Sequence, residues 1–213
     1  MSRTAEAVWS RVVPNSPVFT TSEVASQADT SIDVASRDLA VMRRQGLIVR
    51  ISTGVWAYNH DPRFSVYAVV PALVSLSGPR SVGYVSLLSA LNLHGMISQI
   101  PRSVHVVCSH RRARVKRTSV GTYAFYMMQP SLVGGFERHS NGTFQLARPE
   151  KALFDLLFYS TRRGTRFAHT SGISLPRAFS FTELNEWIER VRPSGLRVGV
   201  RRRWQVLQQR LEH

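Results

Sequence analysis

Cysteine is nearly absent from this sequence, with Cys108 the single example among 213 residues. An internal disulfide is therefore excluded, and the apolar run VHVVCS around Cys108 predicts a buried structural thiol rather than a reactive one. Long apolar runs are missing as well. None reaches the about 18 residues of a membrane-spanning helix, and the start, MSRTAEAVWSRVV, lacks the apolar region of a secretory signal. These absences lead us to expect a cytoplasmic protein with no membrane partner.

Catalytic and metal-binding motifs are also lacking. The histidines form no HExxH motif and no spacing with cysteine that suits a metal, and the sequence has no Gly-rich phosphate loop and no GxSxG segment. Glu150 and Asp155 could belong to a nuclease carboxylate set, but at positions i and i+5 of a helix they would point about 140° apart. The sequence therefore predicts no metal site, no cofactor and no enzymatic activity.

Acidic residues are scarce, because 28 lysines and arginines stand against 13 aspartates and glutamates, a formal net charge of +15. Only Lys116 and Lys151 are lysines, so arginine dominates the basic residues. Guanidinium groups form paired hydrogen bonds with phosphates and base edges, which favours a nucleic-acid partner over a merely solvated surface. Residues 1–66 hold seven arginines and six acids, whereas residues 67–213 hold 21 basic and seven acidic residues. The second part of the chain therefore carries nearly all of the positive charge.

The first 60 residues have the element order of a winged helix-turn-helix. Apolar residues at helical spacing predict a first helix over residues 5–13, ended by the segment PNSP. A capping box, TTSE, predicts a second helix over residues 20–26, and a third follows over residues 31–46, whose last residue is a glycine. LIVRI and VWAY then predict two short strands around a turn. We expect a winged helix-turn-helix domain over residues 1–66.

A mixed α/β domain is predicted over residues 67–210. The segment 66–76 is apolar but interrupted by proline, so its type stays open, and a helix is expected over residues 81–94. Strands are expected at 103–109 and 122–128, with a hairpin centred on Asn141-Gly142 within 136–147. Further helices are expected from Pro149, from the capping box at Ser180 through Val191, and over residues 199–210.

These elements define the fold class as α+β, with an N-terminal winged helix-turn-helix followed by a mixed α/β domain around a mainly antiparallel sheet. The last residues, 211–213, read LEH and resemble a remnant of an expression tag.

The start of the third predicted helix would lie in the major groove of DNA, where side chains reach base edges. The candidate residues at this start are Ser31, Asp33, Ser36 and Arg37. Arg37 is the strongest base reader, because a guanidinium can bind O6 and N7 of guanine together. Candidates for phosphate or minor-groove contacts are Arg43, Arg44, Arg50 and Thr53. Asp33 opposes phosphate, and a winged module that only binds proteins stays open as an alternative.

Two basic tracts without an acidic residue lie in the second part of the chain. The candidate residues of the first tract are Arg102, Arg111, Arg112, Arg114, Lys116 and Arg117. Those of the second tract are Arg197, Arg201, Arg202 and Arg203. Such tracts are usually solvated surfaces, but two in one domain favour an anionic partner, either DNA or an acidic protein. Whether they meet in space cannot be read from the sequence.

Several segments resemble the AbiEi family of antitoxins from type IV toxin-antitoxin systems. They are VFTTSEVA, LAVMRRQGLIVRISTGVWAY, SVGYVSLLSALNLHGMISQIPRSVHVV and GTFQLARPEKALFDLL, and together they span roughly residues 18–158. The resemblance implies an N-terminal domain that binds inverted repeats in its own promoter. It also implies a C-terminal domain that opposes an AbiEii-type nucleotidyltransferase toxin in abortive infection, a form of phage defence. A homodimer on double-stranded DNA is consistent with inverted repeats.

Two functions therefore fit the residues. The leading hypothesis is a transcriptional repressor and antitoxin that regulates its own operon, and the alternative is a winged-helix regulator without a toxin. A nucleic-acid enzyme would require metal-dependent cleavage that depends on Glu150 or Asp155.

Overall fold

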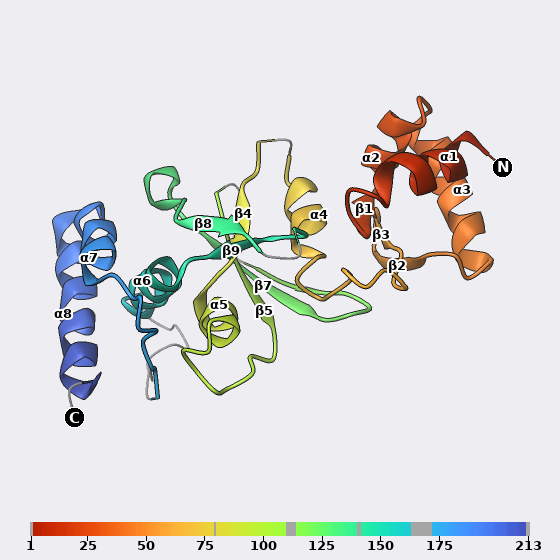
Figure 1. The fold of residues 1–213 in the computed structure, drawn as a ribbon. Coiled ribbons are helices and arrows are strands. Elements are labelled where there is room, and N and C mark those ends of the chain that lie inside the picture. The colour runs from red at the N-terminus through yellow and green to blue at the C-terminus, as the bar shows by residue number, and fades with distance from the viewer. Residues whose placement is uncertain (1, 79, 110–113, 140–141, 163–171, 212–213) are drawn as a thin grey trace.

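A computed structural model describes residues 2–78, 80–109, 114–139, 142–162 and 172–211. It contains a small three-stranded sheet with helices near the N-terminus and a six-stranded sheet flanked by helices in the rest of the chain (Figure 1). The predicted α+β class is confirmed. No helix in these ranges has the length and apolar character that crossing a membrane requires.

The N-terminal part follows the predicted order of elements, with one addition. Its elements are α1 (Arg3–Ala7), the π-helical turn η1 (Val8–Val12), β1 (Val18–Thr20), α2 (Thr21–Gln27), α3 (Ile32–Arg44), β2 (Val49–Ser52) and β3 (Val55–Ala57). The addition is β1, which pairs with β3, so that the antiparallel sheet has the order β1-β3-β2. This strand was not predicted from the sequence. Its three residues, VFT, show no clear strand pattern, and they pair with residues 35 to 39 positions further along the chain.

The ends of α2 and α3 follow from local sequence. Glu23 N donates to Thr20 Oγ1 at 3.1 Å, and Thr20 N donates to the Glu23 carboxylate at 3.5 Å, which completes the predicted capping box. Gly46 has φ +73°, and it donates to Arg43 O while Leu47 N donates to Met42 O. This is a Schellman motif, which explains why the third helix ends where the glycine predicted.

The larger part of the chain builds the six-stranded sheet and its helices. Its elements are α4 (Val70–Ser75), β4 (Gly83–Val85), α5 (Leu87–Leu93), β5 (Val104–Cys108), β6 (Arg114–Arg117), β7 (Thr122–Met127), the 3-10 turn η2 (Pro130–Leu132), β8 (Phe136–Arg138), β9 (Gln145–Ala147), α6 (Pro149–Ser160), α7 (Phe181–Glu189) and α8 (Ser194–Leu211). The strand order is β6-β7-β5-β4-β9-β8. In the described part, β5–β7 and β4–β9 are parallel and the other three neighbouring pairs are antiparallel, so the sheet is mixed.

The prediction of one helix over residues 81–94 is wrong in its first half. Residues Gly83–Val85 form the central strand β4, and α5 begins only at Leu87. Leu87 has φ +53°, which turns the chain sharply from the strand into the helix. Tyr84 and Val85 are both fully buried, so neither a helical nor an alternating pattern marks this short apolar segment.

The predicted hairpin is present as the antiparallel pair β8–β9. Phe136 pairs with Ala147 and Arg138 with Gln145, a register centred on Asn141-Gly142. Asn141 lies outside the described residues, whereas Gly142 has φ +71° and its N donates to His139 O at 2.6 Å. Gly142 therefore ends a turn that begins at His139, so the loop is longer than the two-residue turn that Asn-Gly predicts.

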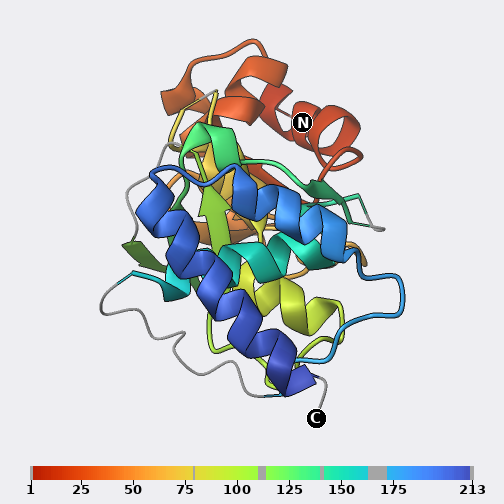
Figure 2. The ribbon, with the colours of Figure 1, turned by 90° about the vertical axis from the view of Figure 1, so that its left-hand side faces the viewer.

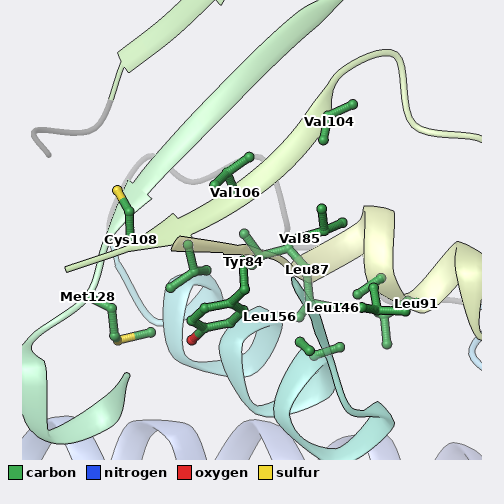
Figure 3. Packing of buried hydrophobic residues seen from close by; sticks show 14 of the residues in the cluster. Tyr84, Val85, Leu87, Leu91, Val104, Val106, Cys108, Met128, Leu146 and Leu156 are labelled. Carbon is green, nitrogen blue, oxygen red and sulfur yellow. The ribbon is translucent and has the colours of Figure 1, made fainter. Parts of the chain in front are cut away.

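Two buried clusters share the small sheet between them. Phe19 and Trp56 point toward the N-terminal helices, whereas Val18, Val55 and Ala57 on the opposite face join the core of the larger part. That larger core lies between the six-stranded sheet and its helices, where the Tyr84 side chain points from β4 toward α6 (Figure 3). Cys108 belongs to this core and is buried, as predicted. The small sheet is therefore covered on both faces, and a fragment ending at residue 66 would expose apolar side chains.

Candidate nucleic-acid interface

The outer face of α3 is free of packing contacts with the core. Ala35, Leu39 and Met42 are the buried positions of this helix, and they recur at the helical period. The α3 residues singled out from the sequence all lie on the exposed side, and they are Ser31, Asp33, Ser36, Arg37, Arg43 and Arg44. The amphipathic pattern therefore separates a core face from a face open to a partner.

At the start of α3, two of these residues already have local roles. Ser31 is the N-cap, and its Oγ accepts a hydrogen bond from Val34 N at 3.3 Å. Arg37 Nε donates to Asp33 O at 3.4 Å, which directs the side chain along the helix toward its N-terminal end. No ion pair engages Arg37 in the part of the chain that the structure describes. Its terminal nitrogens are therefore available to an acceptor beyond the first turn of α3.

The β2–β3 ribbon lies beside the end of α3 and carries the exposed Arg50 and Thr53. The guanidinium of Arg50 lies over the ring of Trp56 at 5.6 Å from its centroid. Trp56 Nε1 in turn donates to Thr21 Oγ1 of α2 at 2.9 Å. The ribbon is thus fixed to the helix that precedes α3, and Arg50 is held on its surface.

The loop between β6 and β7 reaches this ribbon. Ser119 Oγ donates to Arg50 O at 3.0 Å, and Ser119 N donates to Ile51 O at 3.1 Å. Figure 1 shows the β6–β7 hairpin extending from the large sheet toward β2. Lys116 and Arg117 end β6 immediately before this loop, and Arg117 is exposed. The structure therefore brings part of the first basic tract next to Arg50, which the sequence alone could not establish.

Arg102 lies at the same end of the large sheet as the β6–β7 loop. Strands β5 and β7 are parallel, with Val104 opposite Tyr123, so the residues before β5 lie level with the β6–β7 loop. Arg102 is exposed there. For the rest of the first tract, Arg111 and Arg112 lie outside the described residues, and Arg114 is described only as the first backbone position of β6.

The second basic tract lies on α8, which packs against α6 and α7 at the end of the molecule remote from α3 (Figures 1 and 2). Arg201 forms an ion pair with Glu189 of α7, and Arg197 Nε lies 4.0 Å from the same carboxylate. Arg202 and Arg203 are exposed. The tract itself holds no acidic residue, but the neighbouring helix α7 supplies Glu189. Part of the positive charge of the tract is therefore offset by an ion pair.

The two carboxylates considered for nuclease chemistry are buried in separate hydrogen-bond networks. Glu150 Oε1 accepts from Ser180 N at 2.7 Å, at the start of α7. Asp155 pairs with Lys151 and accepts from Ser86 Oγ at 2.7 Å and from Tyr84 Oη at 3.2 Å. Burial lowers the pKa of Lys151 and raises the pKa of Asp155, while their mutual attraction opposes both shifts.

Another buried titratable group is His105. Burial lowers the pKa of His105 to about 4, so this imidazole is neutral in the folded protein. Within the described ranges, no group of three or more histidine, cysteine, aspartate or glutamate side chains is arranged to hold a metal ion. The candidates of residues 31–53 and the end of β6 thus share one surface, made of α3 and the adjoining ribbon, and the second basic tract lies apart on α8.

Fold and surface define an α+β protein with an exposed, arginine-bearing helix. No family model matches the chain, and no curated protein matches it. A solved structure to which it is similar is the solution structure of the antibiotic-resistance factor ANT(2'')-Ia, with a TM-score of 0.31 and 10% sequence identity over 68% of this chain and 96% of that chain. At this TM-score the similarity assigns neither a fold family nor an activity.

Proposed function

We propose that the protein is a DNA-binding transcriptional repressor whose residues 1–66 act as a winged helix-turn-helix. The observation that carries the proposal is the exposed face of α3, which presents Arg37 near its start and Arg43 and Arg44 at its end. Helix α2 precedes α3 as the first helix of the pair, and the β2–β3 ribbon beside it serves as the wing.

On DNA, α3 enters the major groove and Arg37 reads a guanine through O6 and N7. Arg43, Arg44 and Arg50 bind phosphates on either side of the groove. Residues 1–66 alone carry seven arginines and six acids, so their electrostatic attraction to DNA is weak. Arg117, positioned by the contact of Ser119 with Arg50, adds positive charge from the larger part of the chain.

Replacement of Arg37 tests the base-reading role. Arg37→Ala should lower the preference for DNA upstream of its own gene over scrambled DNA by about 1–3 kcal/mol, because a bidentate contact with guanine is lost. Gel-shift titrations of both duplexes would measure this preference. Arg37→Lys is the matched control: it keeps the charge, so it should retain affinity for scrambled DNA while losing discrimination. If Arg37→Ala kept the same preference for the native over the scrambled DNA, Arg37 would not be the residue that reads the bases.

The resemblance to AbiEi antitoxins extends the proposal to an operon with a nucleotidyltransferase toxin. In this function the protein binds inverted repeats in its promoter as a homodimer, and the N-terminal domain thereby represses transcription. The larger domain opposes the toxin. When a neighbouring nucleotidyltransferase gene arrests the growth of cells, co-expression of this protein should restore their growth. Absence of such a gene beside this one, or failure to restore growth, would leave the alternative of a regulator without a toxin.

A further inference from the structure

A groove of about 450 Å³ separates the C-terminal part of α6 from α8. Arg202, Arg203 and Arg210 line it from α8, and Leu157, Ser160 and the following Thr161 line it from the end of α6. Figure 2 shows these two helices crossing at the surface that faces the viewer, with α8 in front. The groove lies outside the proposed DNA interface. Its three arginines give it the positive charge that an anion-binding site requires.

The described residues supply no ion-pair partner to the arginines of this groove, in contrast to the opposite flank of the same helix. Glu189 forms an ion pair with Arg201 and lies 4.0 Å from Arg197 Nε, so it offsets part of the charge on the flank that faces α7. Arg202, Arg203 and Arg210 form no ion pair within the described ranges, and all three are exposed. A helical period of about 100° per residue explains the separation, since residues 202, 203 and 210 fall within an arc of about 100° and residues 197 and 201 lie on the other side of α8.

We infer that this groove binds the phosphodiester backbone of a nucleic-acid strand. Arg202 and Arg203 lie two helical turns from Arg210, which is about 10–12 Å along the axis at 1.5 Å per residue. An isolated phosphate occupies only part of this length. A nucleic-acid strand, with a phosphate for about every 3.4 Å of duplex axis, presents charges along the whole groove.

The other groups in the groove indicate recognition through charge and not through bases. Ser160 Oγ donates to Leu156 O and Thr161 Oγ1 to Phe158 O, both at 2.6 Å, so their protons are committed to the α6 backbone. None of the described residues that line the groove is aromatic, so no ring is offered for base stacking. Guanidinium groups are thus the donors for the ligand, and binding is independent of base sequence.

This site does not depend on the proposed repressor function, because α3 and α8 lie at opposite ends of the molecule (Figures 1 and 2). A duplex held by α3 leaves the groove open to a second strand. Recognition of promoter DNA through Arg37 and binding of a strand through α8 can therefore be measured separately, and either proposal can fail without the other.

The test uses the full-length protein and a labelled 20-nucleotide single-stranded RNA, followed by fluorescence anisotropy across a salt series. The double variant Arg202→Ser/Arg203→Ser should bind about tenfold more weakly at 0.15 M salt, with the slope of log affinity against log salt reduced by about 1.4. Arg197→Ser/Arg201→Ser removes the same charge from the opposite flank and should change affinity less than twofold. Single-stranded DNA of the same sequence should behave as the RNA does.

A second readout locates the bound strand. RNA carrying 4-thiouridine should crosslink to peptides of α6 or α8 in the native protein and lose these crosslinks in Arg202→Ser/Arg203→Ser. Equal losses of affinity in the two double variants would overturn the inference in favour of a general charge effect, as would no loss in either. Poly-glutamate that binds as tightly as the RNA would also overturn it, because the groove would then select an acidic polypeptide.

Discussion

Lys151→Ala is expected to lower the free energy of unfolding by about 3–5 kcal/mol, because it leaves the carboxylate of Asp155 buried without its cationic partner. Both side chains are completely buried, with 0% of their surface exposed. Small proteins are stable by about 5–15 kcal/mol in total, so this single change removes a large share. Urea denaturation followed by circular dichroism and by tryptophan fluorescence would measure the loss.

The surroundings of Lys151 are mainly apolar. Its ammonium lies 4.8 Å from the ring centroids of both Phe154 and Trp187 and 5.6 Å from that of Tyr84, so aromatic faces enclose it. The backbone of Gly135 lies against the same side chain, where an added Cβ would be 3.0 Å from Lys151 Cβ. After the change Asp155 keeps, among the described residues, only its hydrogen bonds from Ser86 Oγ and Tyr84 Oη.

Two comparisons separate the loss of a charge partner from a loss of packing. The double variant Lys151→Met/Asp155→Leu replaces the pair by apolar side chains of similar size and should recover most of the lost stability. Arg201→Ala removes one partner of the exposed pair with Glu189 and should cost less than about 1 kcal/mol. If Lys151→Met alone were as stable as the native protein, the ion pair would contribute little, and the expectation would be contradicted.

Local sequence was sufficient for the elements whose ends are fixed by neighbouring residues. Thr20 and Glu23 form their capping box within one turn, and Gly46 ends α3 through bonds to the same turn. The exposed face of α3 was equally predictable, because its buried positions recur at a single period. In each case the determining contacts lie within six residues of one another.

The features that sequence reasoning missed depend on contacts between distant residues. Strand β4 was expected as part of a helix, because its burial between β5 and β9 leaves no period to read. Glu189 lies outside the second basic tract, yet the packing of α7 on α8 brings it to Arg197 and Arg201, where it offsets part of their charge. The contact of Ser119 with Arg50 spans 69 positions, so the approach of β6 to the ribbon could not be foreseen.

The joint removal of four phosphate-binding arginines should have the largest effect on DNA affinity. We expect the variant Arg43→Ser/Arg44→Ser/Arg50→Ser/Arg117→Ser to bind promoter DNA about 10³-fold more weakly at 0.15 M salt, because each lost phosphate contact lowers the salt slope by about 0.9. The slope of log affinity against log salt should therefore fall by about 3–4. Anisotropy titrations at four or more salt concentrations would measure both quantities.

The ratio of affinities for promoter and scrambled DNA should stay nearly unchanged in this variant, because Arg37 still reads the bases while only phosphate contacts are lost. Its charge-matched control is Arg190→Ser/Arg192→Ser/Arg197→Ser/Arg201→Ser, which removes four arginines from α8 and the segment before it, remote from α3 and outside the groove between α6 and α8. That control should keep promoter affinity within about threefold, since charges beyond a Debye length of about 8 Å are largely screened. Equal losses in both quadruple variants would mean that DNA responds to the total charge of +15, and the interface built from α3, the ribbon and β6 would then be wrong.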